Sequence, residues 1–171
     1  TGEVTSPVSA KEDLLAFTGK QMVYLQREKK RYSFKNDFEM KYSIGLMEEK
    51  LVIPQGENNV SINDLNGKQL VSINTTAGNI KTLTLNLFAI LAQNSLRIYN
   101  INGSFVKAIY SKNYAVTDKK IIYSSRNKVY FCEFNGSESH IDLPENIYLI
   151  GLGKNEAVAL TENGKIFQIN Y

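Results

Sequence analysis

Short apolar runs alternate with turn residues along the whole chain. The runs lie at residues 14–17, 51–53, 88–92, 121–123 and 157–160. Each run is followed by a turn and then by a segment in which apolar and polar side chains alternate. Apolar runs of this length, bounded by turns and rich in β-branched and aromatic residues, are typical of strands. No segment shows convincingly the three- and four-residue spacing of an amphipathic helix. The pattern predicts an all-β protein.

The alternating segments resemble one another. Residues 97–102 read Arg-Ile-Tyr-Asn-Ile-Asn and residues 165–170 read Lys-Ile-Phe-Gln-Ile-Asn, while residues 21–26, 61–66 and 130–135 share the frame. The frames end at positions 26, 66, 102, 135 and 170, which lie 33 to 40 residues apart. A repeat of this length carried by strands is typical of the blades of a β-propeller.

A complete repeat contains four predicted strands. Asn-Gly follows three of the frames, at positions 66–67, 102–103 and 135–136, and predicts type I′ hairpin turns leading to outer strands. Innermost strands are expected at 40–44, 80–85, 114–117 and 147–150. The sequence therefore predicts a single domain, residues 1–171, with blades at about 8–34, 40–73, 80–110, 114–143 and 147–171.

The last repeat lacks an outer strand, because the fifth frame stops at residues 170–171. Two alternatives fit this pattern. Residues 1–7 supply the missing strand and close a propeller of about five blades, or the chain is an incomplete part of a larger propeller that other blades complete. Another all-β fold is the third alternative.

The end of the second repeat, Val-Ser-Ile-Asn-Asp-Leu-Asn-Gly-Lys at residues 60–68, resembles the end of a WD40 repeat. The chain has no Trp, and the Gly-His pair of that family is missing. The resemblance is therefore to a degenerate, WD40-like or quinoprotein-like β-propeller. It implies a rigid scaffold whose variable loops bind partners. The positions equivalent to the Trp of that family hold Asn63, Tyr99, Cys132 and Phe167, and those equivalent to its Asp hold Asp64, Asn100, Glu133 and Gln168.

Composition narrows the functional classes. The chain has 20 Lys and Arg against 17 Asp and Glu, a net charge of +3, which is too small by itself to indicate a nucleic-acid footprint. No apolar run reaches the roughly 18 residues of a membrane span, and no secretory signal opens the chain. The single cysteine, Cys132, excludes a disulfide framework and predicts a buried, reduced thiol. We expect an intracellular protein of the cytoplasm or nucleus.

Catalytic chemistry is hard to assemble from this sequence. The only histidine, His140, lies on a predicted outer strand, and the predicted innermost strands contain no Asp or Glu. Zinc-ligand spacing, a phosphate-binding loop and a dinucleotide fingerprint are absent from the sequence. The sequence predicts a non-enzyme without a metal or cofactor.

The leading functional prediction is a non-catalytic scaffold or adaptor within a larger intracellular complex. The expected partners are other protein subunits, including a chain that completes the open propeller edge. An alternative is a subunit that contacts nucleic acid through a basic rim at Lys29, Lys30 and Arg31. The loops expected on the binding face contain Asn36, Phe38, Lys112, Tyr114, Arg126 and Asn127.

Overall fold

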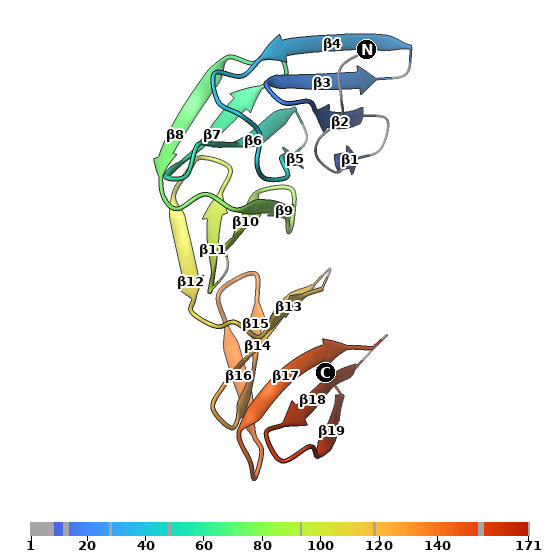
Figure 1. Ribbon diagram of the computed structural model, residues 1–171, viewed down its shortest axis with the longest axis vertical. Coiled ribbons are helices and arrows are strands. Elements are labelled where there is room, and N and C mark those ends of the chain that lie inside the picture. Colours follow the sequence, from blue (N-terminus) through green and yellow to red (C-terminus); the bar gives the residue numbers. More distant parts are fainter. Residues whose placement is uncertain are drawn as a thin grey trace. The chain divides into compact units, whose positions relative to one another are not determined.

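The computed structural model describes residues 9–11, 14–27, 29–47, 49–92, 94–117, 119–153 and 156–170, and within these ranges every regular element is a β-strand (Figure 1). The strands form five antiparallel sheets, each built from strands that are consecutive in the chain. Four sheets have four strands and the fifth has three in the described ranges. The prediction of an all-β fold built from repeated sheets is confirmed.

The sheets follow the order of the chain. The first contains β1 (Ser9–Lys11), β2 (Leu14–Thr18), β3 (Met22–Arg27) and β4 (Lys30–Lys35). The second contains β5 (Gly45–Met47), β6 (Lys50–Gln55), β7 (Asn59–Asp64) and β8 (Gln69–Asn74). The third contains β9 (Asn79–Thr82), β10 (Leu87–Ala92), β11 (Ser95–Asn100) and β12 (Phe105–Ile109). The fourth contains β13 (Tyr114–Val116), β14 (Lys120–Ser125), β15 (Lys128–Glu133) and β16 (Glu138–Asp142). The fifth contains β17 (Ile147–Leu152), β18 (Glu156–Thr161) and β19 (Ile166–Asn170).

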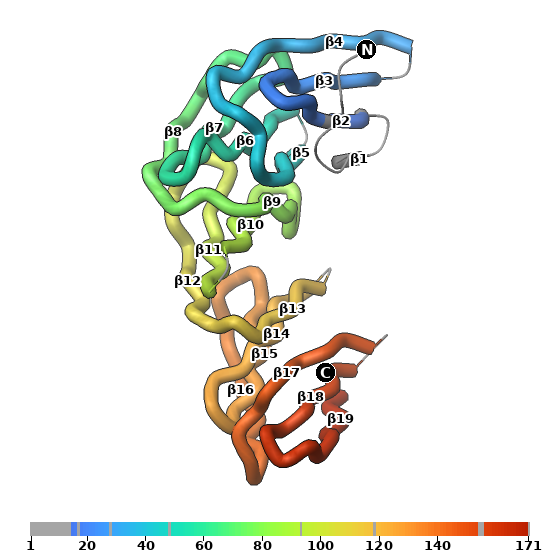
Figure 2. Tube along the Cα trace, in the orientation of Figure 1, coloured from blue at the N-terminus to red at the C-terminus, as the bar shows by residue number. Residues whose placement is uncertain are grey.

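The chain divides into two compact units, residues 1–108 and 109–171, with the boundary near the end of β12. Each unit is described by itself, and the expectation of a single domain stays a prediction. Within the first unit the chain passes from each outermost strand to the innermost strand of the next sheet, from β4 to β5 and from β8 to β9 (Figure 2). This is the connection expected between successive blades.

The core of the first unit lies between consecutive sheets. Leu51 and Ile53 on β6 pack with side chains of the first sheet such as Leu25, whereas Val52 packs with Phe88 of the third sheet. All five side chains are at least 99% buried. Both faces of the second sheet are therefore covered, which explains why its second strand is a continuous apolar run. Each such side chain contributes about 1.5–3 kcal/mol by leaving water.

The second unit repeats this arrangement with one core cluster. Ile122 and Phe131 of the fourth sheet pack against Ala157, Ala159 and Ile169 of the fifth.

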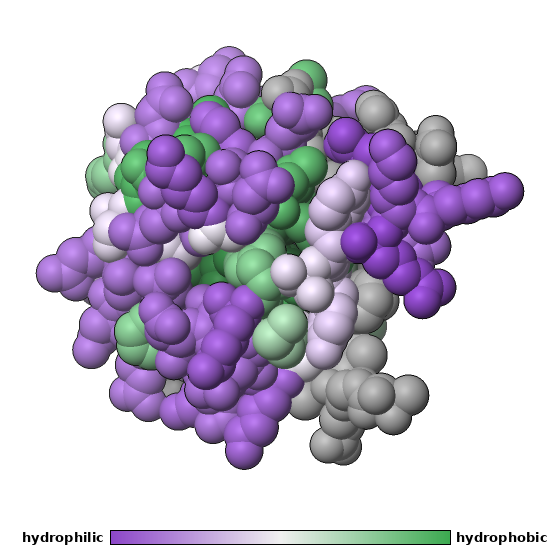
Figure 3. Space-filling view, turned by 90° about the horizontal axis from the view of Figure 1, so that it is seen from above, coloured by the Kyte–Doolittle hydropathy of each residue, from purple (hydrophilic) through white to green (hydrophobic). Residues whose placement is uncertain are grey.

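The surface that is visible in Figure 3 is mostly hydrophilic, and apolar side chains reach it in patches. Among the described residues, no helix is long and apolar enough to cross a membrane.

The innermost strand of the second sheet is not where the sequence placed it. It spans Gly45–Met47 instead of residues 40–44. A Cβ atom on Gly45 would lie 2.4 Å from Cγ2 of Ile80 on β9, so only glycine allows these two innermost strands to approach. Met40 and Ile44 are buried in the core from a loop, which produced their strand-like apolar pattern.

The predicted type I′ turns are also wrong. In the hairpin after β7, the amide of Gly67 donates to the carbonyl of Asp64 (3.1 Å) and the amide of Asp64 donates to the carbonyl of Lys68 (3.0 Å). Gly67 has a φ of +86°, whereas Asn66 does not have a positive φ. These features define a three-residue loop with a type I turn and a glycine bulge. The hairpins at Gly103, Gly136 and Gly164 repeat this pattern.

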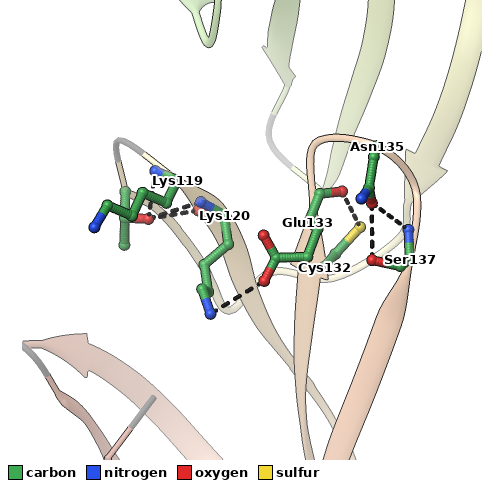
Figure 4. A network of polar contacts seen from close by, with 7 residues as sticks. Lys119, Lys120, Cys132, Glu133, Asn135 and Ser137 are labelled. Carbon is green, nitrogen blue, oxygen red and sulfur yellow. Dashed lines mark hydrogen bonds and ion pairs between the residues drawn. The ribbon is translucent and has the colours of Figure 1, made fainter.

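A side-chain oxygen of an Asp or Asn accepts backbone hydrogen bonds in the hairpins of the second, third and fourth sheets. Oδ1 of Asp64 accepts hydrogen bonds from the amides of Asn66 and Lys68, both at 2.9 Å, and Oδ1 of Asn100 accepts two equivalent bonds. The hairpin after β15 has Glu133 at this position, and there Oδ1 of Asn135 accepts from the amide of Ser137 (2.9 Å, Figure 4). In the second and third sheets, the position that matches the Asp of the WD40 family therefore serves the local turn.

The fifth sheet has an open edge in the described part of the chain. Strand β19 pairs with β18, and no further described strand pairs with it. Residues 1–7, the predicted closing strand, lie outside the described residues. The two ways of completing the propeller stay predictions.

Candidate functional site

The predicted binding residues fall into two groups, one in each compact unit. Asn36 and Phe38 lie in the loop between β4 and β5 of the first unit. The other four lie at one end of the fourth sheet in the second unit: Lys112, Tyr114, Arg126 and Asn127.

Asn36 is engaged in shaping its own loop. Its side chain is buried, and its amide Nδ2 donates to the carbonyl of Phe38 (2.8 Å) and contacts Sδ of Met40 (3.1 Å). Phe38 is 44% exposed, and its ring lies 3.6 Å from the position that a Cβ atom of Gly56 would take. Of these two residues, Phe38 is the one that presents a side chain to solvent.

The second group is held together by backbone and side-chain hydrogen bonds. The backbone carbonyl of Asn113 accepts a hydrogen bond from the amide of Ser124 (3.0 Å). The side-chain Nδ2 of Asn113 donates a hydrogen bond to the carbonyl of Tyr148 (2.7 Å). The carbonyl of Arg126 accepts from the amide of Ile147 (2.8 Å). Three loop segments of the fourth and fifth sheets therefore meet at one end of the second unit.

Arg126 and Asn127 play different roles in this cluster. Asn127 donates from Nδ2 to the carbonyl of Leu143, and its own carbonyl accepts from the amide of Leu143, both at 2.8 Å. Arg126 has a φ of +55°, the only positive φ of a non-glycine residue in the described chain, and its side chain is exposed. Asn127 fixes the loop, and Arg126 carries a cation at its surface.

Two exposed tyrosines belong to the same chain segments and were missed by sequence reasoning. Tyr110 is 77% exposed and lies two residues before Lys112, and Tyr148 is 65% exposed and is joined to Asn113 through its carbonyl. A tyrosine in a β-prone run is usually assigned to the core, so only its exposure reveals it. We name the exposed side chains of Tyr110, Lys112, Arg126 and Tyr148, together with Tyr114, the loop site.

Tyr114 connects the loop site to a row of aromatic side chains across the fourth sheet. Strand pairing places it opposite Tyr123, which is opposite Tyr130, which is opposite His140. The rings of Tyr123 and Tyr130 are stacked, with centroids 4.8 Å apart and an interplanar angle of 6°. Burial raises the pKa of Tyr114. Burial, and then the hydrogen bond that the Tyr123 hydroxyl donates to Glu138 (2.7 Å), raise the pKa of Tyr123 strongly.

The two candidate reactive side chains lie away from the loop site. His140 is exposed on β16, where its Nε2 is 3.1 Å from Nζ of Lys128 and 3.5 Å from Oδ2 of Asp142. Cys132 is fully buried and unpaired by a disulfide, and its thiol contacts the carbonyl of Glu133 (3.5 Å, Figure 4). The predicted buried thiol is confirmed. Among the described residues, no group of three or more His, Cys, Asp and Glu side chains converges to hold a metal ion.

The residues of the predicted basic rim lie in a turn and on both faces of β4. Lys29 lies in the turn between β3 and β4, and the strand pairs Arg27–Lys30 and Gln26–Arg31 place Lys30 and Arg31 on opposite faces of the sheet. Nε of Arg31 donates to Oε1 of Gln26 (3.2 Å). Contact with nucleic acid through these residues stays a prediction.

Comparison with known proteins defines the fold. No family model and no curated protein matches the sequence. Among solved structures, BamB from Moraxella catarrhalis matches 99% of this chain and 59% of its own, with a TM-score of 0.66 and 10% identity. Hsv2 from Kluyveromyces lactis matches 92% of this chain and 56% of its own, with a TM-score of 0.60 and 10% identity. The WD40 β-propeller domain of Doa1 matches 96% of this chain and 67% of its own, with a TM-score of 0.50 and 13% identity.

These matches show that the sheets are β-propeller blades, as the sequence predicted. At 10–13% identity they show the fold alone. The chain spans 56–67% of the length of these structures. Streptogramin B lyase also matches, with a TM-score of 0.56 and 13% identity over 96% of this chain and 67% of its own. The proteins with this fold therefore include an enzyme.

Proposed function

We propose that this protein is a non-catalytic scaffold that binds another protein through the loop site, as a subunit of an intracellular complex of the cytoplasm or nucleus. The observation that carries the proposal is the composition of this cluster. Two highly exposed tyrosines, Tyr110 before β13 and Tyr148 on β17, and two exposed cations, Lys112 and Arg126, belong to neighbouring segments that hydrogen bonds join. Tyrosine and arginine are enriched among the residues that dominate protein–protein binding energy.

The rigidity of the loops favours binding over catalysis. Asn113 and Asn127 tie the segments to one another at 2.7–2.8 Å, so the tyrosines are displayed at little cost in conformational entropy. The site offers cations and hydroxyls but no described carboxylate–histidine pair, and His140 lies on an outer strand away from it. Such a surface suits a partner with an acidic or polar face.

The open edge of β19 gives a second place for a protein subunit. Ile166 on this strand is 71% exposed, and the free backbone groups of an edge strand pair readily with an added strand. A partner segment that pairs with β19 would give the fifth sheet the four strands of the other sheets.

The test compares two double variants of the full chain as baits in cells of the source organism, with quantitative mass spectrometry of what is retained. Arg126→Asn with Tyr148→Ser removes a cation and an aromatic ring, and asparagine tolerates the positive φ. The matched control is Lys119→Gln with Ile141→Ser, which changes an exposed cation and an exposed apolar side chain elsewhere in the same unit. We expect the first variant to lose a partner that the wild type and the control retain. Equal retention by all three proteins would refute the loop site.

A further inference from the structure

A pocket of about 300 Å³ lies between the first two sheets, within the first unit. One wall comes from β3 and β4 of the first sheet, and the other comes from the turn before β6 and the hairpin after β7. The volume is at the lower end of the range of small-molecule and peptide side-chain pockets. Its lining residues are Leu25, Arg27, Tyr32, Glu49, Asp64, Leu65 and Asn66.

The two walls carry opposite charges. Strand pairing places Arg27 opposite Lys30 and Leu25 opposite Tyr32, so the four side chains lie on one face of the first sheet. Leu25, Arg27 and Tyr32 line the pocket, and Lys30 lies next to Arg27 outside the lining. The second sheet contributes two carboxylates, those of Glu49 and Asp64. Tyr32 and Leu65 supply apolar surface beside these charged groups, and the buried side chain of Leu25 lies at the base of the first wall.

The contact across the pocket is weak enough for a ligand to replace. Nη1 of Arg27 is 3.7 Å from Oε1 of Glu49, and their side chains are 39% and 78% exposed. An ion pair with this exposure contributes about 0.2–1 kcal/mol. A ligand that offers its own carboxylate to the first wall and its own ammonium to the second therefore loses little by displacing it.

The walls themselves are fixed before any ligand binds. Oδ1 of Asp64 accepts two backbone hydrogen bonds at 2.9 Å, which hold the hairpin that carries Leu65 and Asn66. The ring of Phe34 lies directly against Gly67 of the same hairpin, where a Cβ atom would be only 2.5 Å from it. A preformed site loses less entropy on binding than one that must be ordered.

We propose that this pocket binds a linear peptide segment of a partner protein in which an apolar residue stands between an acidic and a basic residue. The acidic side chain pairs with Arg27 and Lys30, the apolar one packs on Leu65 and Tyr32, and the basic one pairs with Glu49. A nucleic acid fits this site less well, because its phosphates would lie beside the carboxylates of Glu49 and Asp64. The proposal goes beyond the loop site, since the pocket lies in the other unit and is tested by different variants.

The test is an NMR titration of the isotopically labelled full chain with a blocked Gly-Glu-Leu-Lys-Gly peptide. The backbone amide signals of Tyr32, Leu65 and Asn66 report the binding. We expect saturable shifts at these residues with a dissociation constant on the order of 1 mM. Peptides with glutamine in place of both charged residues, or glycine in place of leucine, should bind more weakly.

Variants locate the binding. Lys30→Gln and Glu49→Gln should each weaken the peptide about threefold to fivefold, as expected for exposed charge pairs. The matched controls are Lys41→Gln and Glu57→Gln, which remove the members of another exposed ion pair in the same unit (3.5 Å) and should leave the affinity within about twofold. The folded state of every variant is verified from its amide spectrum.

Any one of four results of these peptide titrations would overturn the proposal. They are the absence of shifts at the lining residues, equal binding of the uncharged peptide, equal effects of pocket and control variants, and free leucine binding as tightly as the peptide. A single-stranded RNA that shifts these amides when the peptide does not would also overturn it. None of these results bears on the loop site, which is tested by capture of a protein partner.

Discussion

Two of the hairpin glycines, Gly67 and Gly136, provide a sharp test of how the blades are packed. Gly67 and Gly136 have the same turn and a similar φ, +86° and +94°. A Cβ atom on Gly67 would lie 2.5–2.6 Å from the ring of Phe34, whereas a Cβ atom on Gly136 would have no neighbour within 4 Å. Replacing each glycine by alanine therefore separates the cost of the backbone conformation from the cost of steric contact.

The magnitudes follow from these two terms. A positive φ costs an alanine about 1–2 kcal/mol relative to glycine. Forcing a methyl group against a packed ring adds about 1–3 kcal/mol, because the ring or the hairpin must move. Gly136→Ala should thus lower the free energy of unfolding by about 1–2 kcal/mol and Gly67→Ala by about 2–5 kcal/mol.

The measurement is urea unfolding of the full chain, monitored by far-ultraviolet circular dichroism. The free energy of unfolding is compared with the wild type for the transition that each variant affects. Because the two glycines lie in different units, a double-mutant cycle within the first unit completes the test. In a Phe34→Val background, Gly67→Ala should cost about 1–2 kcal/mol less than in the wild type. If Gly67→Ala costs no more than Gly136→Ala, or if Phe34→Val brings no relief, the reasoning is wrong.

Three further predictions concern polar groups. Asp64→Ala should lower the free energy of unfolding by about 1–2 kcal/mol, because two backbone amides lose their acceptor, whereas Asp64→Asn keeps it and should stay within about 0.5 kcal/mol in the same urea assay. The raised pKa of Tyr123 favours its neutral form in the folded state, so stability should fall as the pH rises above about 10 and fall less steeply in Tyr123→Phe. The hydrogen bond from Lys165 holds the pKa of Glu145 below its usual range, so this carboxylate stabilises the fold above its ordinary pKa and loses that effect as the pH falls through its lowered pKa. Thermal unfolding across the acid range should show a smaller pH dependence for Glu145→Gln, and an unchanged slope would contradict the assignment.

The repeat of strands could be predicted from the sequence because each unit carries its own pattern. The apolar runs at residues 51–53 and 157–160 fall within β6 and β18, and the frames fall on the strands that follow. The turn type could not be predicted from Asn-Gly alone, because that dipeptide fits both a two-residue turn and a three-residue loop. In the second and third sheets a further signal was the acceptor two residues before the asparagine, Asp64 or Asn100, which bonds the loop amides.

The candidate site could be predicted only in outline. The loops at residues 112–114 and 126–127 do meet, because the alternation of strands and turns brings them to one end of the fourth sheet. Whether a polar side chain there faces solvent or serves the loop depends on tertiary contacts. Asn127 donates to the carbonyl of Leu143, whereas Tyr148, which has a strand-like neighbourhood, points outward.

The stacked pair of Tyr123 and Tyr130 also gives the molecule an optical reporter. The chain contains no Trp, so its near-ultraviolet signals come from tyrosine and phenylalanine. Two nearly parallel phenol rings 4.8 Å apart couple their electronic transitions, and both lie in the second unit. The exciton signature of this pair therefore disappears when the fourth sheet opens, regardless of the first three sheets. Unfolding of the second unit can thus be followed by itself, without any label.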